Sequence, residues 1–466
     1  MTKILNTMSG QKEEFIPREE DKINMFVCGP TVYDYIHIGN ARTFVFFDVV
    51  AKYLRHKGYE VNYIQNITDI DNKIIERAQK EGANPLEYAK KYTEIFKQDM
   101  QALGVTSPEY KNATDHIPEV TKQVQTLLDK GNAYVIENDG IYFDLSTFPD
   151  YGKLSGRTAG MADDAVSRID DSDKKRNRGD FALWKFSQED DPSWPAPFGD
   201  GRPGWHIEDT AITEKYFGPQ YDIHGGGQDL IFPHHEAEIA QQESASGKKP
   251  FVKYWMHVAF VINKKQKMSK SLDNFETAHE LLKKYPKEVL RFYLLSGRYR
   301  TPLDFNEKIL IQSAAAVQRI SEFKRALEVT DQKGQSNIFK HNDKVVNPIG
   351  SEKMFFKSLD NDFNTQEAFG HLFGLIRALN LPLRMEAISK EYARPVLEFL
   401  DKVNEILGIV PTNHIEILKE VIKLITKREG LREQKNWQKA DKLRAQIINL
   451  GYTIEDTVYG PLVVKK

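Results

Sequence analysis

The chain has 466 residues, which is too long for one compact hydrophobic core and predicts about two to four domains. Its 65 Lys and Arg nearly balance its 67 Asp and Glu, so the overall charge does not indicate a nucleic-acid partner, and any basic surface has to be local. One cysteine excludes an intrachain disulfide. The start of the chain lacks the apolar core of a signal peptide, and no run of about 18 apolar residues occurs. We therefore expect a cytoplasmic protein with no membrane partner.

The first part of the chain alternates strands and helices. Residues 22–27 form a β-rich run that ends at a Gly-Pro turn, and residues 40–58 have helical periodicity. Residues 60–67 form a buried strand, and residues 68–82 open with Thr and Asp, as a capped helix does. This alternation predicts a Rossmann-like, doubly wound parallel sheet. Ligands of such sheets bind beyond the carboxyl ends of the strands, where residues 28–40 and 68–71 fall.

Residues 130–203 differ in composition from the segments before and after them, which indicates an inserted subdomain. They are rich in charge, Gly and Pro, with short β runs such as "GIYFDL". Alternation resumes with a helix over 204–218 and a strand from 221 that runs into a glycine loop. A helix over 230–245 and a strand over 254–262 follow.

After residue 305 the pattern is almost entirely helical until a terminal β-hairpin over 451–466. The helical part divides near Ile409-Val410-Pro411. We therefore predict an α/β domain made of residues 1–129 and 204–304, interrupted by the insertion at 130–203. A helical bundle over 305–411 and a small domain over 412–466 complete the chain.

Two short motifs carry candidate chemistry. "HIGN", His37 to Asn40, lies at a predicted helix start, where free backbone N–H groups favour an anion and Gly39 allows close approach of a ligand. "KKQKMSKSLDN", residues 264–274, is a lysine-rich loop that suits charge developing on polyphosphate during transfer. Each motif alone also fits a structural role: His37 can pack at the helix start, and the lysines can form a solvated turn.

Together, and in this order, the two motifs resemble the class I aminoacyl-tRNA synthetases. Longer segments narrow the resemblance to the cysteinyl-tRNA synthetase family: "NMFVCGPTVYDYIHIGNARTFVFFDVV", "RPGWHIE", "DIHGGGQDLIFPHHEAEIAQ", "DNDFNTQEA" and "NWQKADKLRAQIINLGYTIEDT". The resemblance implies a monomer that activates L-cysteine with ATP and Mg²⁺ and transfers it to the 3′ adenosine of tRNA(Cys). It assigns catalytic roles to His37, Asn40, Lys267 and Lys270, nucleotide binding to Gly39, Gly225, Gly226, Gly227, Asp229 and Lys270, and the cysteine pocket to Thr68 and Trp205.

The same resemblance implies one Zn²⁺ ion, which would tell cysteine from serine. A thiol loses its proton readily to Zn²⁺ and becomes a strong soft ligand, whereas a serine hydroxyl does not. The ligands implied are Cys28, Asp209, His234 and Glu238, where Asp209 in "GWHIEDT" replaces a cysteine of the family pattern "GWHIEC". Helical spacing alone would accept His235 with Glu238 almost as well as His234 with Glu238. We expect zinc still to bind, through a harder donor set.

The C-terminal part contains a candidate tRNA-binding surface. Residues 415–444 contain nine bases and five acids, an excess that can follow a phosphate backbone, and Trp437 could stack on an unpaired base. The alternative for this segment is a solvated helix face with Trp437 in its core. The resemblance favours an anticodon-binding domain over 412–466. Two rival functions remain at this stage: a ligase that joins cysteine to an amino sugar, and a catalytically silent RNA-binding paralogue.

Overall fold

The computed structural model describes two compact units. Unit 1 comprises Met1–Asn306, Ile349–Gly374 and Glu405–Leu407, and unit 2 comprises Glu307–Pro348, Leu375–Asn404 and Gly408–Lys466. Within the described ranges, no helix is both long and apolar enough to cross a membrane. These ranges are 1–157, 172–188, 191–263, 266–267, 276–333, 348–385, 387–411, 419–457 and 460–465.

A five-stranded parallel sheet forms the centre of unit 1, as predicted. Its strand order is β11-β10-β3-β4-β5, and every neighbouring pair is parallel. Because the chain proceeds outward from β3 in one direction to β5 and later in the other direction from β10, the sheet has a topological switch point between β3 and β10. The strands are β3 (Lys22–Val27), β4 (Glu60–Ile67), β5 (Glu109–Asn112), β10 (Tyr221–Gly227) and β11 (Val252–Val258).

Helix α1 (Ile38–His56) follows β3 and is almost wholly buried. Its apolar residues pack all round, and its two buried charges have partners. Asp48 pairs with Arg291 at 2.9 Å. The guanidinium of Arg42 donates hydrogen bonds to four carbonyl oxygens, those of Ala259, Phe260, Arg298 and Thr301.

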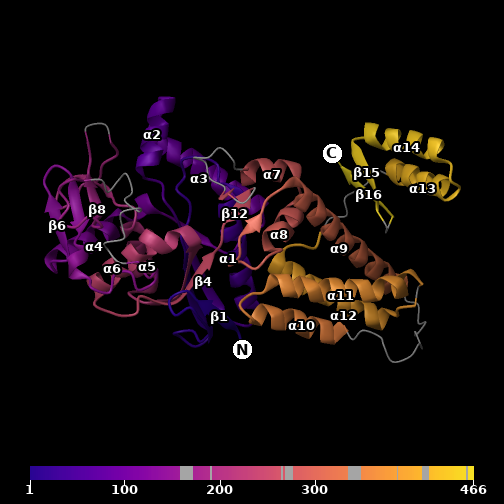
Figure 1. The fold of residues 1–466 in the computed structure, drawn as a ribbon, viewed down its shortest axis with the longest axis horizontal. Helices are drawn as coiled ribbons and strands as arrows, with labels where there is room; N and C mark the ends of the chain where they lie inside the picture. The colour runs from indigo at the N-terminus through magenta and orange to yellow at the C-terminus, as the bar shows by residue number, and fades with distance from the viewer. Residues whose placement is uncertain are drawn as a thin grey trace. The chain divides into compact units, whose positions relative to one another are not determined.

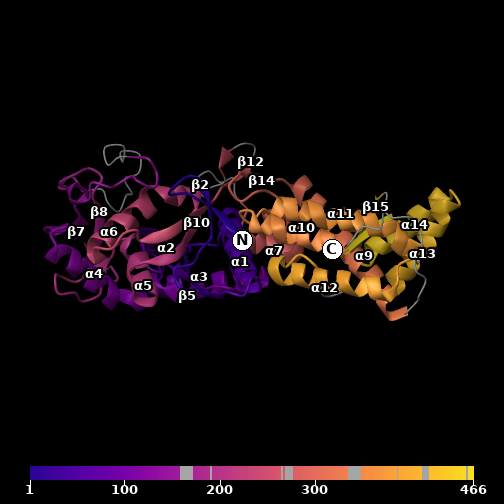
Figure 2. The same cartoon turned by 90° about the horizontal axis from the view of Figure 1, so that it is seen from below.

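The predicted insertion contains an antiparallel sheet of its own, with order β6-β7-β8-β9. Its strands are β6 (Ala133–Ile136), β7 (Gly140–Phe143), β8 (Phe181–Phe186) and β9 (Gly201–Pro203). In both views this sheet lies at one end of unit 1, with α4 (Ile117–Asp129) and α6 (Glu236–Ser246) beside it (Figure 1, Figure 2).

The structure corrects two predicted boundaries. The glycine run after His224 belongs to β10, which continues to Gly227, so it is strand and not loop. The regular part of the helix predicted from residue 230 begins at Glu236; Ile231–His235 form a π-helical turn with non-helical backbone at Phe232.

The remaining elements agree with the predicted helical part and terminal hairpin. In unit 2, α13 and α14 lie side by side, and the antiparallel hairpin of β15 and β16 is next to α14 (Figure 1). Unit 1 also contains β1 (Lys3–Asn6), β2 (Gln11–Glu14), α2 (Asn72–Glu81), α3 (Pro85–Ala102), α5 (Ile207–Phe217), β12 (Val261–Asn263), β13 (Gln266–Lys267), α7 (Ala278–Lys284), α8 (Lys287–Leu295) and β14 (Leu303–Asp304). The later elements are α9 (Glu307–Lys333), α10 (Pro348–Asp360), α11 (Thr365–Arg384), α12 (Lys390–Leu407), α13 (Lys419–Glu433), α14 (Trp437–Asn449), β15 (Tyr452–Thr457) and β16 (Gly460–Lys465).

Candidate active site and metal centre

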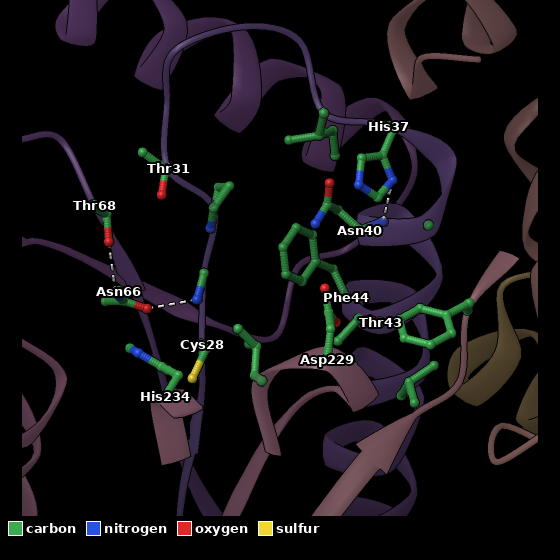
Figure 3. A pocket seen from close by; sticks show the side chains of 18 of the residues that line it. Cys28, Thr31, His37, Asn40, Thr43, Phe44, Asn66, Thr68, Asp229 and His234 are labelled. Carbon is green, nitrogen blue, oxygen red and sulfur yellow. Dashed lines mark hydrogen bonds between the residues drawn. The ribbon is translucent and has the colours of Figure 1, made fainter. Parts of the chain in front are cut away.

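A cavity of about 280 Å³ lies at the carboxyl ends of β3, β4 and β10, beside the switch point. Figure 3 shows the side chains that converge on it from the loop after β3, the start of α1 and the end of β4. The structure brings most of the predicted site residues to this one cavity: Cys28, His37, Gly39, Asn40, Thr68, Trp205, Asp209, Gly227, Asp229 and His234.

A buried cluster contains one thiol, one imidazole and two carboxylates; Cys28, Asp209 and His234 of this cluster line the cavity, whereas Glu238 does not. Nε2 of His234 lies 3.0 Å from Oδ2 of Asp209 and 2.9 Å from Oε1 of Glu238. Sγ of Cys28 lies 3.8 Å from the same Glu238 oxygen. The four side chains each offer a ligand atom, all within 4.8 Å of one another. Thiolate, imidazole and carboxylate are the donors that bind Zn²⁺ in proteins.

The cluster fits a bound cation. Oδ1 of Asp209 is buried and accepts no hydrogen bond from any described residue. A buried polar atom without a partner is costly, and a metal ligand bond would satisfy it. Asp209, His234 and Glu238 are at most 2% exposed, and Cys28 is 5% exposed.

The electrostatics of the cluster point the same way. Burial raises the pKa of the Cys28 thiol, and the carboxylates of Glu238 and Asp209 raise it further. Burial alone would lower the pKa of His234, but the same two carboxylates outweigh it and raise the pKa to about 10. The site is therefore rich in negative charge, which a divalent cation would neutralise while favouring the thiolate.

A second group of possible ligands shares Cys28 and Glu238. Nε2 of His224 lies 3.3 Å from Sγ of Cys28, and Nε2 of His235 lies 3.1 Å from it. The ligand atoms of these three residues and of Glu238 all lie within 4.8 Å of one another. Neither histidine lines the cavity. The sequence pattern indicated His235 only through its helical spacing to Glu238, and it gave no role to His224. His224 contacts Cys28 although the two residues are 196 positions apart in the sequence, and no local sequence pattern reveals such a contact.

His234 is held by two neighbours that precede α5. Its Nδ1 lies 2.7 Å from Nδ1 of His206, and its ring stacks on Trp205 at 4.5 Å between centroids. The carbonyl of His206 in turn accepts a hydrogen bond from Gln241 at 2.6 Å. Second partners of this kind fix the orientation of a metal-ligating imidazole. The sequence predicted Trp205 but missed His206, although both stand in "GWHIEDT".

The start of α1 lines the same cavity as the buried cluster, and its free backbone N–H groups could receive an anion. His37 is the N-cap, and its Nδ1 accepts a hydrogen bond from the backbone N–H of Asn40 at 3.2 Å (Figure 3). In the neutral imidazole the proton then resides on Nε2, which can donate. A Cβ on Gly39 would lie 2.8 Å from the His37 ring, so glycine leaves room for that ring to cap the helix.

Thr68 is fixed by hydrogen bonds that join β4 to the loop after β3. Its hydroxyl donates to Oε1 of the buried Glu208 and accepts from Nδ2 of Asn66 at 3.3 Å. Oδ1 of Asn66 accepts from the N–H of Gly29 at 2.6 Å (Figure 3). This network sets the position of the Cys28–Gly29 peptide against the end of β4. Neither Asn66 nor Glu208 was predicted.

The three glycines of β10 have different surroundings. A Cβ on Gly225 would lie 2.2 Å from the ring of Phe47, so this glycine lets α1 pack on the sheet. Gly227 lines the cavity, as does Asp229.

The lysine motif is described only at residues 266–267, where the backbone of Lys267 belongs to β13. Lys270 lies outside the described residues.

The structure shows that some of the basic side chains counted near the C-terminus are paired with a carboxylate and so are less able to bind RNA phosphates. Arg428 is 1% exposed and pairs with Asp456 at 2.7 Å, and Arg432 pairs with the same carboxylate at 2.8 Å. The predicted excess of positive charge on this segment is therefore smaller at the surface than in the sequence. Trp437 is 55% exposed, with the Arg432 guanidinium 5.6 Å from its ring centroid, so it lies outside the core.

Comparison with known proteins agrees with this geometry. Residues 14–315 match the family described as tRNA synthetases class I (C) catalytic domain. A cysteine–tRNA ligase of Carboxydothermus hydrogenoformans is 44% identical, over 98% of both chains, and one of Clostridioides difficile is 41% identical, also over 98% of both. The chain belongs to the cysteine–tRNA ligase family. Residues 354–411 also match the DALR domain.

Solved structures share the fold of this ligase at low sequence identity. Methionyl-tRNA synthetase of Mycobacterium tuberculosis, bound to methionyl-adenylate, superposes with a TM-score of 0.63 at 14% identity. It covers 83% of this chain and 89% of its own. A leucyl-tRNA synthetase of Agrobacterium radiobacter gives a TM-score of 0.62 at 10% identity over 85% of both chains. These likenesses agree with the predicted doubly wound parallel sheet.

Proposed function

We propose that the protein activates L-cysteine with ATP and Mg²⁺ and transfers the cysteinyl group to the 3′ adenosine of tRNA(Cys). One observation carries this proposal: Cys28, Asp209 and His234 line the same cavity as a capped helix N-terminus, and Glu238 lies within 4.8 Å of their ligand atoms. The first group can select a thiol substrate through a metal, and the second can hold a phosphate. Family membership supports the same reaction.

In this proposal Zn²⁺ is held by Cys28, Asp209, His234 and Glu238. This group is favoured over the group with His224 and His235 because Asp209 and His234 line the cavity, whereas His224 and His235 lie behind it. A metal that selects a substrate thiol has to present a coordination position to the substrate. When bound, Zn²⁺ would take the substrate sulfur as a thiolate and thereby reject serine.

The residues at the start of α1 would act on the α-phosphate of ATP. The helix N-terminus offers backbone N–H groups, and Nε2 of His37 can donate a hydrogen bond to a phosphate oxygen as negative charge grows there. Asn40 lines the same end of the cavity. The substrate carboxylate attacks the α-phosphorus, its oxygen forms the new P–O bond, and pyrophosphate leaves with the electrons of the broken bond.

Other residues would place the two substrates. Thr68 and Trp205 wall the cysteine end of the cavity, next to His234. Asp229 would bind the substrate amine or the ribose, and Gly39 and Gly227, which line the cavity, would admit the adenosine, with Gly225 and Gly226 in the strand that leads to it. Lys267 and Lys270 would hold the β and γ phosphates, an assignment that rests on their motif in the sequence.

The domains after the catalytic sheet would serve tRNA. We propose that residues 305–411 form a bundle and residues 412–466 bind the anticodon, with 1–129 and 204–304 as the catalytic domain and 130–203 as its insertion. The exposed Trp437 and the exposed bases of α13 and α14, among them Lys427, Lys439 and Lys442, support an RNA-facing surface there.

Two assays test the proposal. Purified protein should contain about one zinc per chain and catalyse ATP–pyrophosphate exchange with cysteine but not with serine. It should then charge tRNA(Cys). Exchange without charging would indicate a ligase acting on another acceptor such as an amino sugar, and no exchange would indicate a silent paralogue. A metal-free active enzyme would overturn the zinc proposal.

A further inference from the structure

Helix α2 carries a stripe of three basic side chains that begins at the cavity. The stripe residues are spaced four and three apart, so they share one face of the helix, and all three are exposed. The opposite face packs into the protein through Ile74, Ile75 and Ala78. Figure 1 shows α2 projecting at the edge of unit 1. The basic stripe consists of Lys73, Arg77 and Lys80.

The inner end of the basic stripe is part of the cavity wall. Lys73 lines the cavity together with Tyr33, and Nζ of Lys73 lies 5.7 Å from the centroid of the Tyr33 ring. Tyr33 thus gives a half-buried aromatic ring at the point where the basic stripe meets the active site. Bases stack on such rings in single-stranded nucleic-acid sites, and lysines nearby follow the backbone.

Acidic side chains offset part of the positive charge of the stripe: Asp71 interacts electrostatically with Lys73, and Glu76 is three positions from Lys73 and four from Lys80. Arg77 lies 4.0 Å from Asp34, at the limit of an ion pair, and its side chain is 48% exposed. Glu81 accepts a hydrogen bond from Tyr88 at 3.1 Å, which directs it toward α3. Glu76 flanks the stripe and is exposed.

The stripe is held on a well-anchored helix. Asp71 caps α2 by accepting a hydrogen bond from the N–H of Lys73 at 2.8 Å. At the same end, Arg202 of β9 donates to the side chain of Asn72. The first turn of α2 is therefore capped by Asp71 and joined to β9 of the inserted sheet, so Lys73 has a defined place in the cavity wall.

We propose that the basic stripe of α2 binds successive phosphates of the single-stranded 3′ end of tRNA as that end enters the cavity, with Tyr33 as a stacking surface. The inference rests on the proposed function, since the cavity has to receive the tRNA terminus. A merely solvated helix face would need no contact with the cavity, whereas this stripe starts in its wall. Side chains on neighbouring turns have Cβ atoms about 5–6 Å apart, so flexible Lys and Arg can reach consecutive phosphates.

The test measures binding of fluorescein-labelled tRNA(Cys) by the full-length zinc enzyme between about 50 and 200 mM KCl. Each phosphate contact on a single strand contributes about 0.7 to the slope of log K against log salt, so K73Q/R77Q/K80Q should lower the slope by about 2. The ratio of wild-type to variant affinity should accordingly fall roughly 20-fold as KCl rises across this range. Glutamine preserves helix propensity, so α2 should still form.

Two further variants separate a specific contact from a change in net charge. Lys248 is exposed before β11, at the amino edge of the sheet and away from the cavity, so K248Q should keep the wild-type slope. Glu76→Gln removes a negative charge beside the stripe and should tighten binding. An unchanged slope in the triple variant, or an equal fall per charge in K248Q, would overturn the inference. Failure of the proposed function would appear separately, as wild-type enzyme that does not charge tRNA(Cys).

Discussion

Oδ2 of Asp209 lies 3.0 Å from Nε2 of His234, although the two residues are 25 positions apart and on different helical segments. Asp209 lies in the first turn of α5, and His234 lies in the turn before α6. Their contact puts a carboxylate where the resemblance from the sequence implies a second cysteine. The proposed donor set of this chain thus contains one thiolate, and no disulfide can form within it because the chain has one cysteine.

Replacing Asp209 should change the metal site in a graded way. Asp209→Ala should lower zinc affinity by at least about tenfold, because a direct ligand contributes no less than its supporting partners. Asp209→Cys should retain zinc and, after replacement by Co²⁺, should show stronger sulfur-to-metal charge-transfer absorption than wild type. Competition with a chelator and the Co²⁺ spectrum measure these effects. Wild-type affinity in Asp209→Ala would remove this residue from the ligand set.

His234 and His224 distinguish the two possible ligand groups. His234→Asn should lose zinc, whereas His224→Asn should retain most of it, because only His234 faces the cavity. Elemental analysis of the two purified variants, with circular dichroism as a control for folding, measures the difference. The reverse result would place the metal behind the cavity wall, against His224 and His235.

Cys28→Ser should abolish zinc binding and the activation of cysteine, since a buried hydroxyl does not become an anionic ligand under these conditions. The change is nearly isosteric, so the protein should remain folded. Zinc content and ATP–pyrophosphate exchange are the measurements. Normal zinc content in this variant would refute the role of the single thiol.

Lys270→Ala should slow formation of the adenylate by about 10²–10³-fold, as is usual when one stabilising group of a transition state is removed. Binding of cysteine should change far less. Pre-steady-state kinetics of adenylate formation measure the first effect, and cysteine titration measures the second. Lys248→Ala serves as a control for loss of a lysine, and an unchanged rate in Lys270→Ala would remove the lysine motif from the mechanism.

Asp48→Asn should destabilise the fold by about 3–5 kcal/mol, because it leaves Arg291 buried without its counter-charge. Burial alone would raise the pKa of Asp48, but Arg291 and Lys52 outweigh it and the pKa is lowered. A lowered folded-state pKa means that the stabilisation is present above the unfolded pKa of about 3.9 and is lost as pH falls below it. The difference between wild type and variant in urea unfolding should thus be constant from pH 7 to 5 and shrink near pH 4. Asp150→Asn, at an exposed ion pair with Lys249, should have almost no effect.

The elements around Cys28 could be predicted because local patterns specify them. The β-rich run of β3, the apolar length of α1 and the Asp71 cap of α2 are all readable within a few residues. The glycines of β10 misled the prediction, since glycine is rare in strands. Here one of them is required by Phe47 of α1, a residue far away in the sequence.

The polar contacts within the site could be predicted less well from the sequence than the helices and strands that surround it. His206 and His224 act through partners 28 and 196 positions away, and only the fold brings such pairs together. Likewise, the count of bases near the C-terminus gave no sign that Arg428 is buried against Asp456. Patterns of spacing report which face of an element is apolar, but they do not report which polar groups of distant elements meet.

The guanidinium of Arg42 binds carbonyls that precede and follow residues 264–274 in the sequence, and His37 caps the start of its own helix, α1. A single side chain thus connects α1 to two described loop segments, residues 259–260 and 298–301, that are more than two hundred residues away in the chain. A substitution that displaces α1 should therefore also displace the backbone at residues 259–260 and 298–301, so the position of His37 relative to these segments is set by a buried side chain and not by the surface.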